Sequence, residues 1–250
     1  MITAIIIVKN EEKMISDCLA SLSWTDEVLV VDTGSTDDTV KIAKKNGARI
    51  VEYLSGKNFS DWRNKGLKEA KGDWIFYIDA DERVTSELKN EVLELINHQS
   101  LAISHYSAYA VPRKNIILGK LLTHGGWYPD FQKRLFKKET IKGWTGAVHE
   151  EPQFSGELGH LKSPLSHIKH ETIPEMVDKT NRWSEIEAKL MFDANHPPMN
   201  IWRFATAMFR EFWYRMVLKM AFLDGSIGII FAMYQVFSRF VSYAKLWELQ

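Results

Sequence analysis

The stretch "IFYIDADERV" (residues 75–84) joins two patterns that point in different directions. Five apolar or aromatic residues, Trp74 to Ile78, follow one another without a break. A run of this length is typical of a strand that is buried on both faces of a sheet. The run ends at once in three carboxylates, Asp79, Asp81 and Glu82, which a buried strand by itself does not explain.

Similar strands recur upstream and alternate with helical segments. Apolar runs predict strands over 4–8, 27–32, 48–53 and 73–79, and residues with helical spacing predict helices over 12–22, 34–47, 58–72 and 85–96. In the second helical segment, Ser35 or Thr36 is the expected N-terminal cap. Four strand–helix alternations predict an α/β fold with a mostly parallel central sheet flanked by helices.

Polar side chains follow three of these strands. Asn10 and Glu11 come after the first strand, Asp32 ends the second, and Asp79 ends the fourth. The carboxyl ends of parallel strands meet at one edge of a sheet, where ligands bind. Crowded carboxylates repel one another unless a cation lies among them, and Mg²⁺ or Mn²⁺ with a bound phosphate suits such a group. The alternative is that these side chains cap turns, with Asp32 capping the turn at Gly34–Thr36.

Composition narrows the classes of protein. The chain has 250 residues and a formal net charge of zero, so bulk electrostatics do not favour nucleic-acid binding. A single cysteine fits a reducing, cytoplasmic setting, and the N-terminus lacks the basic segment of a signal peptide. We expect a catalytic domain over 1–172, with halves 1–100 and 101–172, and a helical region over 173–250 that begins with a helix at 173–194.

Four motifs resemble those of the family 2 glycosyltransferases. "IIIVKNEE", "VVDTGSTDDT", "WRNKGL" and "IFYIDADE" occur in the order and spacing of that family, which has the nucleotide-diphosphosugar fold called GT-A. This resemblance covers residues 1 to 100. The segments "GGWYPDFQKRLFKK" and "GWTGAVHEEP", with the aromatic C-terminal part, are more loosely similar to the bacterial glucosyltransferases of the lipopolysaccharide or lipooligosaccharide inner core.

The resemblance implies a UDP-sugar site with a divalent cation, Mg²⁺ or Mn²⁺. It implies that the nucleotide-sugar is bound by Asn10 and Glu11 beside the nucleotide, Asp32 at the base or ribose, Arg63 and Asn64 over the base, and Asp79 at the ribose. It implies that Asp81 ligates the metal. For Arg63 and Asn64 the alternative is a solvated helix face.

Sugar transfer to a hydroxyl group with inversion needs a carboxylate that takes the acceptor's proton. Family 2 enzymes place such an acid in a region that corresponds to "GWTGAVHEEP" (143–152), and Glu150 is our candidate, with Glu151 as the open alternative. An ordinary exposed pair of glutamates is the competing interpretation. In "SHIKHE", His170 is a candidate for an additional metal ligand, and we expect structural roles for the other histidines.

The segment "GGWYPDFQKRLF" combines aromatic side chains with an arginine. Aromatic faces pack on sugar rings, and a guanidinium group can bind phosphate through two hydrogen bonds. We therefore expect Trp127 and Tyr128 to line the acceptor entrance and Arg134 to contact diphosphate or a phosphorylated acceptor. Packing in the core is the alternative for the two aromatic residues.

Residues 201–250 differ from the rest of the chain. They hold 13 of the 30 aromatic residues and six basic against three acidic residues. Their longest uncharged stretch, 225–238, has 14 residues, whereas a spanning helix needs roughly 20. This pattern predicts helices that lie in the interface of an anionic membrane, where a lipid-linked acceptor would be found. Packing on the catalytic domain or a homodimer interface is the alternative.

The sequence as a whole predicts a metal-dependent, inverting hexosyltransferase. It would move a hexose, with glucose the expected one, from UDP to a hydroxyl group of a membrane-bound saccharide, as a peripheral protein on the inner face of the cytoplasmic membrane. A nucleotidyltransferase of similar fold is one alternative, although "KNEEKM" (9–14) replaces the glycine-rich basic loop typical of that class. A non-catalytic scaffold that binds a sugar nucleotide or a membrane is the other.

Overall fold

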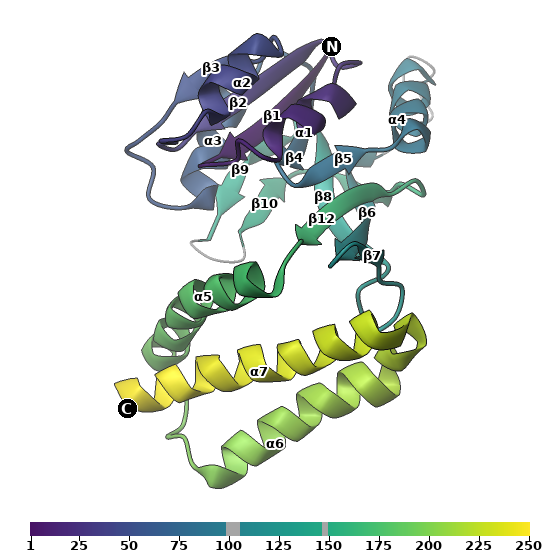
Figure 1. Cartoon of the computed structure of the whole chain (residues 1–250). Helices are drawn as coiled ribbons and strands as arrows, with labels where there is room; N and C mark the ends of the chain where they lie inside the picture. The colour runs from purple at the N-terminus through teal and green to yellow at the C-terminus, as the bar shows by residue number, and fades with distance from the viewer. Residues whose placement is uncertain (99–105, 147–149) are drawn as a thin grey trace. The chain divides into compact units, whose positions relative to one another are not determined.

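The computed structural model describes residues 1–98, 106–146 and 150–250. The chain divides into two compact units (Figure 1). The first unit comprises residues 1–113 and 131–167, and the second comprises 114–130 and 168–250.

The four predicted strands are present and parallel. They are β1 (Ile2–Val8), β2 (Glu27–Asp32), β3 (Arg49–Glu52) and β4 (Trp74–Asp79), in the order β3-β2-β1-β4. In their register, Val8 pairs with Asp32 and Ile7 pairs with Asp79. The exits of β2 and β4 therefore lie at the same edge of the sheet, on either side of β1, as the sequence predicted.

Strands from later in the chain extend this sheet and make it mixed. Beyond β4 the order continues β8-β6-β12-β5, and β8 runs antiparallel to β4. The bounds are β5 (Glu82–Val84), β6 (Tyr106–Ile117), β8 (Asp130–Lys137) and β12 (Leu165–His170), while β7 (Lys120–Leu121) and β11 (Glu157–His160) pair with β6. A separate antiparallel pair consists of β9 (Ile141–Thr145) and β10 (Glu151–Phe154).

Four helices of the first unit follow the predicted segments: α1 (Ile15–Ser21), α2 (Thr39–Lys45), α3 (Phe59–Glu69) and α4 (Ser86–His98). Asn58 caps α3 by accepting a hydrogen bond from the Asp61 amide at 2.9 Å. The predicted cap of α2 is wrong, because neither Ser35 nor Thr36 caps it. The Asp37 carboxylate instead accepts from the Thr39 amide at 3.0 Å, so α2 begins later than expected.

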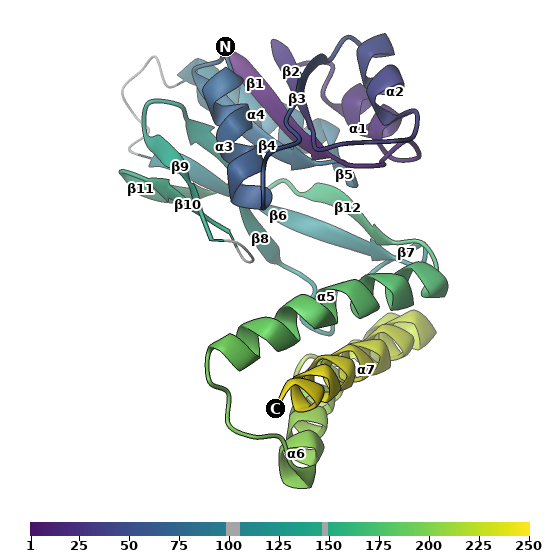
Figure 2. The same ribbon diagram turned by 90° about the vertical axis from the view of Figure 1, so that its left-hand side faces the viewer.

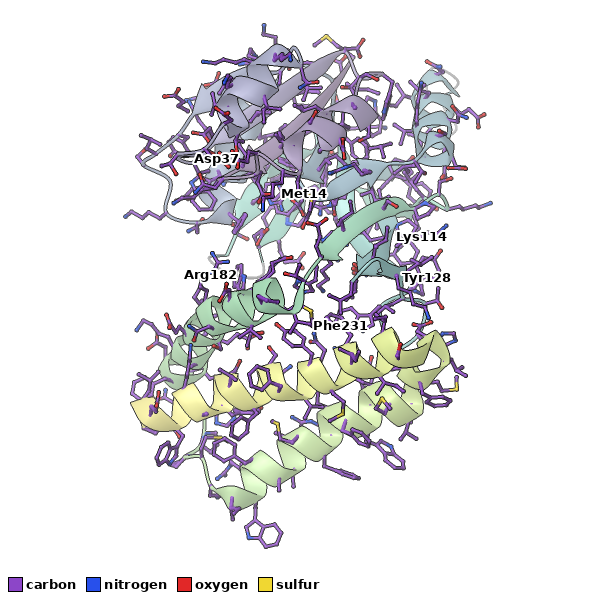
Figure 3. The ribbon with its side chains drawn as sticks, in the orientation of Figure 1. Met14, Asp37, Lys114, Tyr128, Arg182 and Phe231 are labelled. Carbon is purple, nitrogen blue, oxygen red and sulfur yellow. The ribbon has the colours of Figure 1, made fainter. Side chains whose placement is uncertain are left out.

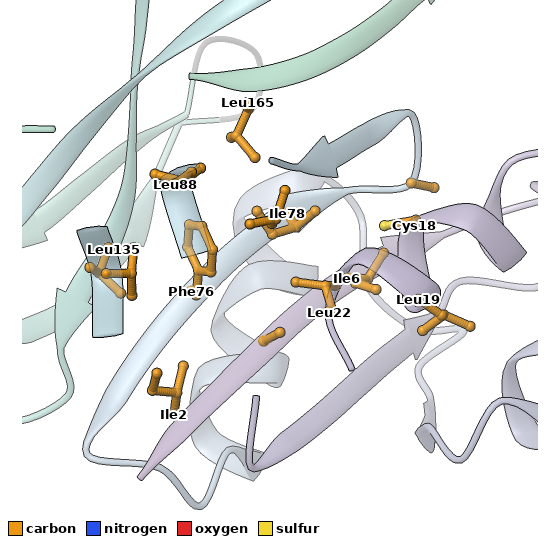
Figure 4. Packing of buried hydrophobic residues seen from close by; sticks show 14 of the residues in the cluster. Ile2, Ile6, Cys18, Leu19, Leu22, Phe76, Ile78, Leu88, Leu135 and Leu165 are labelled. Atoms are coloured by element: carbon orange, nitrogen blue, oxygen red, sulfur yellow. The ribbon is translucent and has the colours of Figure 1, made fainter. Parts of the chain in front are cut away.

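The core of the first unit fills both faces of the sheet because side chains alternate along each strand. On one face, Phe76 and Ile78 pack with Ile6 and Leu22 (Figure 4). On the other face, the fully buried Tyr77 packs edge-on against Trp144, with ring centroids 5.0 Å apart. In Figure 2, α1 and α2 lie to the right of the parallel strands and α3 to their left.

Close packing of α3 on the sheet depends on a glycine. A Cβ atom at Gly66 would lie 2.6 Å from Cγ2 of Ile5, closer than van der Waals contact permits. The helix therefore approaches β1 directly at this point. Arg63 and Asn64 lie three and two residues before Gly66 on the same helix.

The second unit is mostly helical. Its elements are α5 (Ile173–Asp193), α6 (Ile201–Phe212), a π-helical segment η2 (Trp213–Leu218), a 3₁₀ turn η3 (Ala221–Asp224) and α7 (Gly225–Leu249). Helix α7 lies beside both α5 and α6 (Figures 1 and 2). Met176 and Phe231 are fully buried between α5 and α7, and Thr172 caps α5 through the Glu175 amide at 3.3 Å.

One helix of the described chain, Ala221–Leu249, has the length and composition to cross a membrane. Arg239 interrupts this otherwise apolar helix, so its longest uncharged stretch is only the 14 residues 225–238. A core helix of a soluble protein satisfies the same criterion.

Candidate active site

Asn10 and Glu11 join the loop after β1 to the loop after β2. The backbone of Asn10 has a φ of +58°, a left-handed conformation that asparagine adopts more readily than most residues. Its Oδ1 accepts from the Thr36 amide at 2.7 Å, and its amide donates to Ser35 Oγ at 3.0 Å. The Glu11 amide donates to Thr39 Oγ1 at 2.7 Å. Both residues lie at the predicted edge, where they fix two loops.

Asp32 is buried and binds the turn that follows it. Its carboxylate accepts from the Gly34 amide at 3.2 Å and from the Ser35 amide at 3.1 Å. Gly34 has a φ of +106°, which suits glycine. The capping interaction that the sequence left as an alternative for Asp32 is therefore present, and the predicted contact with base or ribose stays a prediction.

A buried ion network lies where β4 ends. Arg134 of β8, which is 4% exposed, forms ion pairs with Asp79 and, at 2.5 Å, with Glu82. Glu82 is fully buried and also pairs with Arg113 of β6 at 3.3 Å. Burial alone would raise the pKa of Asp79, but Arg134 and Arg63 outweigh it and hold that pKa well below the ordinary value. Asp79 therefore stays ionised beside two guanidinium groups.

Arg63 connects this network to Glu150. Its Nε donates to Glu150 Oε1 at 3.1 Å, and its Nη2 lies 3.4 Å from Asp79 Oδ1. The guanidinium carbon lies 4.6 Å from the centroid of the Trp144 ring. A solvated helix face is therefore the wrong interpretation of Arg63, which is only 5% exposed.

Asn64, the next residue on α3, binds the backbone of β9. Its Nδ2 donates to the Trp144 carbonyl at 2.9 Å, and its Oδ1 accepts from the Trp144 amide at 2.7 Å. This pair of hydrogen bonds holds the ring of Trp144 beneath Arg63. Asn64 therefore helps to position the pocket, and its predicted contact with the nucleotide stays a prediction.

A pocket of about 320 Å³ opens over this network. Basic and acidic side chains from five elements meet in it: Arg63, Arg113, Lys133 and Arg134 against Asp79, Glu150 and Glu151. The excess of cations suits a ligand with more than one negative charge. Glu150 and Glu151 differ in setting, because the Glu150 side chain is 18% exposed and that of Glu151 is 63% exposed, in a pair with Lys133.

Asp81 lies beside a histidine that the sequence analysis did not choose. Nε2 of His167 on β12 is 3.3 Å from Asp81 Oδ2, and His167 is only 6% exposed. Within the described ranges, no group of three or more histidine, cysteine or acidic side chains is placed to hold a metal ion. The Asp81–His167 pair nevertheless offers one carboxylate oxygen and one imidazole nitrogen, a set that suits Mn²⁺ better than Mg²⁺.

Comparison with known proteins assigns the family. The profile described as "Glycosyl transferase family 2" matches residues 3–151, which include every strand and side chain of the pocket except part of β10. The chain belongs to glycosyl transferase family 2. It is a glycosyltransferase with a GT-A-like fold, as the four sequence motifs predicted.

One curated relative agrees with this assignment. The glycosyltransferase is 32% identical to an uncharacterized glycosyltransferase of Rickettsia bellii, over 99% of this chain and 86% of the relative. Among solved structures it is similar to Staphylococcus aureus TarS 1–349 in complex with UDP-GlcNAc, with a TM-score of 0.49, 15% identity, and coverage of 99% of this chain and 88% of TarS.

A second similar structure is glucosyl-3-phosphoglycerate synthase from Mycobacterium tuberculosis in complex with Mn²⁺, UDP-glucose and phosphoglyceric acid. Its TM-score is 0.39 at 22% identity, over 56% of this chain and 57% of the synthase.

Three residues that the sequence analysis placed at the site belong to the second unit of the glycosyltransferase. The ring centroid of Trp127 lies 4.8 Å from that of Phe231. Nζ of Lys169 and Cζ of Arg215 each lie 4.4 Å from the same Trp127 centroid. Tyr128, the next residue, is 38% exposed (Figure 3). Trp127 is therefore packed in the core, as the alternative interpretation held. That Trp127 and Tyr128 line the acceptor entrance stays a prediction.

His170 is buried among aromatic rings of the same unit. Its ring centroid lies 5.8 Å from that of Phe231 and 6.3 Å from that of Tyr234. Burial, with Lys179 and Lys169, lowers the pKa of His170 to about 4, although Glu175 opposes the shift from 3.5 Å. Its predicted role as a metal ligand stays a prediction.

The structure thus groups the predicted residues in three places of the first unit. Arg63, Asp79, Arg134 and Glu150 converge on one pocket; Asn10, Glu11 and Asp32 gather at the loop after β2; Asp81 lies against His167. Arg113 and His167 were not singled out from the sequence, and Glu82, grouped there with the carboxylates at the strand exit, is fully buried. The inward and outward alternation of side chains along β6 and β12 was the one signal that could have indicated buried roles for Arg113 and His167. Their partners are distant in the sequence, so no local pattern reveals them.

Proposed function

We propose that this glycosyltransferase moves a hexose, with glucose as the first candidate, from a UDP-sugar to a hydroxyl group of a lipid-linked saccharide. The inner core of lipopolysaccharide is the expected acceptor, and the configuration of the transferred sugar is inverted. One observation carries the proposal. A carboxylate, Glu150, shares a pocket at the exit of β4 with three arginines and a lysine.

The cations of the pocket support a diphosphate donor. Arg113 and Lys133 reach the pocket from β6 and β8, and Arg134 lies deepest, paired with Asp79 and Glu82. Donors fixed in a partly buried site stabilise negative charge more strongly than they would in water. In this proposal they bind the diphosphate and stabilise the charge that develops on it when the sugar leaves.

Asp81 and His167 are the residues that would hold a divalent cation, Mn²⁺ before Mg²⁺. Such an ion, when bound, neutralises charge on the leaving diphosphate. His167 thereby receives the role that the sequence analysis gave to His170. The support is the 3.3 Å distance between His167 Nε2 and Asp81 Oδ2.

Glu150 acts as the general base. The acceptor oxygen forms a bond to the anomeric carbon, the bond from that carbon to the diphosphate oxygen breaks, and the hydroxyl proton passes to the Glu150 carboxylate. Arg63 is a positioning residue in this scheme. It holds Glu150 and Asp79 through one guanidinium group whose plane is fixed against Trp144.

The test is incubation with a panel of UDP-sugars and Mn²⁺ while UDP release is measured. We expect one UDP-hexose to release UDP faster than the others, and addition of a saccharide acceptor to accelerate that release. Asp81→Asn should abolish the release without loss of folding, while the matched control Asp17→Asn, an exposed residue of α1, should not change it. No release with any UDP-sugar, or full activity in Asp81→Asn, would overturn the proposal.

A further inference from the structure

The outer surface of α6 and η2 is an exposed aromatic stripe. Trp202, Phe209 and Trp213 are 77%, 63% and 45% exposed. Their spacing of seven and four residues places them on one face of the helix. Phe209 and Trp213 stack on each other with ring centroids 5.8 Å apart, although both remain open to solvent. A stripe of large aromatic side chains that nothing in the second unit covers is unusual for a solvated surface.

Helix α7 also carries exposed apolar residues. Ile230, Met233, Phe237 and Phe240 follow one another at helical spacing and are 43% to 48% exposed. The opposite side of α7 is buried, with Phe231, Ala232, Ser242 and Leu246 among its buried residues. The helix is therefore apolar on both sides. One side is buried, and on the other side Phe240 contacts Phe204 of α6, with ring centroids 5.7 Å apart, yet stays 48% exposed.

The charges around this surface are mainly positive. Of the three acidic residues in 201–250, Asp224 is buried and bound by the amides of Thr123 and His124, and Glu211 pairs with Arg215 at 2.9 Å. The third, Glu248, is exposed near the end of α7. Arg203, Arg210 and Lys219 are exposed on α6 and just after η2. Exposed basic residues next to tryptophan and phenylalanine are the composition of a helix that binds anionic lipid.

The polar contacts of α7 argue against its crossing the bilayer. Ser242 Oγ donates to Glu187 Oε2 at 2.6 Å, and Lys245 Nζ donates to Asn181 Oδ1 at 2.8 Å. Both partners lie on α5, a helix with charged residues along its length. A spanning α7 would have to break these contacts or carry α5 into the hydrocarbon, where charged side chains are costly.

We propose that α6, η2 and the outer face of α7 form a docking surface for an anionic bilayer, with α6 in the plane of the interface. Trp202, Phe209 and Trp213 enter the boundary between headgroups and acyl chains, while Arg203 and Arg210 bind lipid phosphates. None of these residues lines the pocket, so the test does not depend on the proposed sugar transfer. It would hold the enzyme as a peripheral protein on the inner face of the cytoplasmic membrane.

Flotation of the purified full chain with vesicles tests the proposal. We expect binding to vesicles of phosphatidylcholine that contain phosphatidylglycerol, weaker binding to phosphatidylcholine alone, and release by added salt. Replacement of Arg203 and Arg210 by glutamine should weaken binding by about 25-fold, since each basic residue near an anionic surface contributes roughly fivefold. Trp202→Ala with Phe209→Ala should reduce binding to both kinds of vesicle.

Matched controls lie on α5. Phe192 is 44% exposed, and Arg182 is also exposed, so Phe192→Ala with Arg182→Gln removes the same chemistry from another helix and should leave binding unchanged. Equal losses in the α6 variants and in this control would overturn the proposal. So would vesicle binding that alkaline carbonate cannot reverse, which would indicate a spanning α7. A concentration-dependent dimer that the α6 substitutions disrupt, without any vesicle binding, would overturn it in favour of a second copy of the chain.

Discussion

The parallel strands of the first unit and the C-terminal helices of the second bury apolar residues in different ways. Phe76 and Ile78 on β4 are almost wholly inaccessible, whereas Phe237 and Phe240 on α7 are 45% and 48% exposed. Both regions are rich in apolar residues, and in 201–250 these accompany six basic side chains. An apolar strand in the middle of a sheet is covered on both faces, so its apolar run predicts burial. An apolar helix at the surface can bury one face and keep the other exposed to a further partner.

The largest expected effect concerns the chemistry of the strand region. Glu150→Gln should lower kcat by about 10² to 10⁴, because the variant has no base for the acceptor's proton, while UDP binding stays unchanged. Steady-state UDP release with a saccharide acceptor measures this. Glu151→Gln is the matched control and should lose little, since that side chain is 63% exposed and pairs with Lys133.

Arg63→Gln sharpens the same experiment. A positioning role predicts a fall in kcat with little change in KM, because Glu150 and Asp79 lose the guanidinium group that they share. If Arg63 bound the donor directly, KM would rise instead. Equal activity of the wild-type and Arg63→Gln enzymes would contradict both roles.

The next effect separates the two regions by stability. Phe76→Ala should destabilise the chain by about 3–5 kcal/mol, since it empties a fully buried site. Phe237→Ala should change the free energy of unfolding by only about 0.5 kcal/mol, as exposed positions do. Denaturant unfolding of both variants provides the measurement. A large loss in Phe237→Ala would mean that α7 packs against protein on both sides, and the comparison would fail.

The smallest effect concerns the buried histidine of the second unit. An unfolded histidine titrates near about 6.5, whereas burial and the neighbouring lysines lower the pKa of His170 to about 4. The unfolded state therefore binds the proton first, so stability is full above pH 6.5 and falls as the pH drops toward 4. The loss attributable to His170 is at most about 3 kcal/mol.

His170→Gln should flatten this pH dependence, measured by denaturant unfolding in buffers without added metal. If the free energy of unfolding depends on pH in the same way in the variant and in the wild type, the inference that His170 is buried in its neutral form is wrong.

The parallel half of the fold could be predicted from the sequence because its strands are short, apolar and separated by segments with helical spacing. The register of β1 with β2 and β4 then placed Asp32 and Asp79 at one edge without further information. The partners of Glu82 could not be predicted in this way. Arg113 and Arg134 lie 31 and 52 residues further along the chain, on strands that join the sheet from its antiparallel side.

The same limit explains the histidines. His167 and His170 lie in one short motif, and nothing in "SHIKHE" distinguishes them. The pairing of β12 with β5 does so, because it sets His167 opposite Glu82 and beside Asp81. In the C-terminal region the composition indicated an interface, but it could not show which side of α7 the fold would leave open.

Calorimetric titration of UDP into the full chain, with and without Mn²⁺, tests the central claim that Asp81 brings a divalent cation to a diphosphate at the exit of β4. We predict tight binding of UDP only with Mn²⁺, with that enhancement lost in Asp81→Asn and kept in Asp17→Asn. UDP binding that is equally strong without metal, or that Asp81→Asn leaves unchanged, would contradict the account.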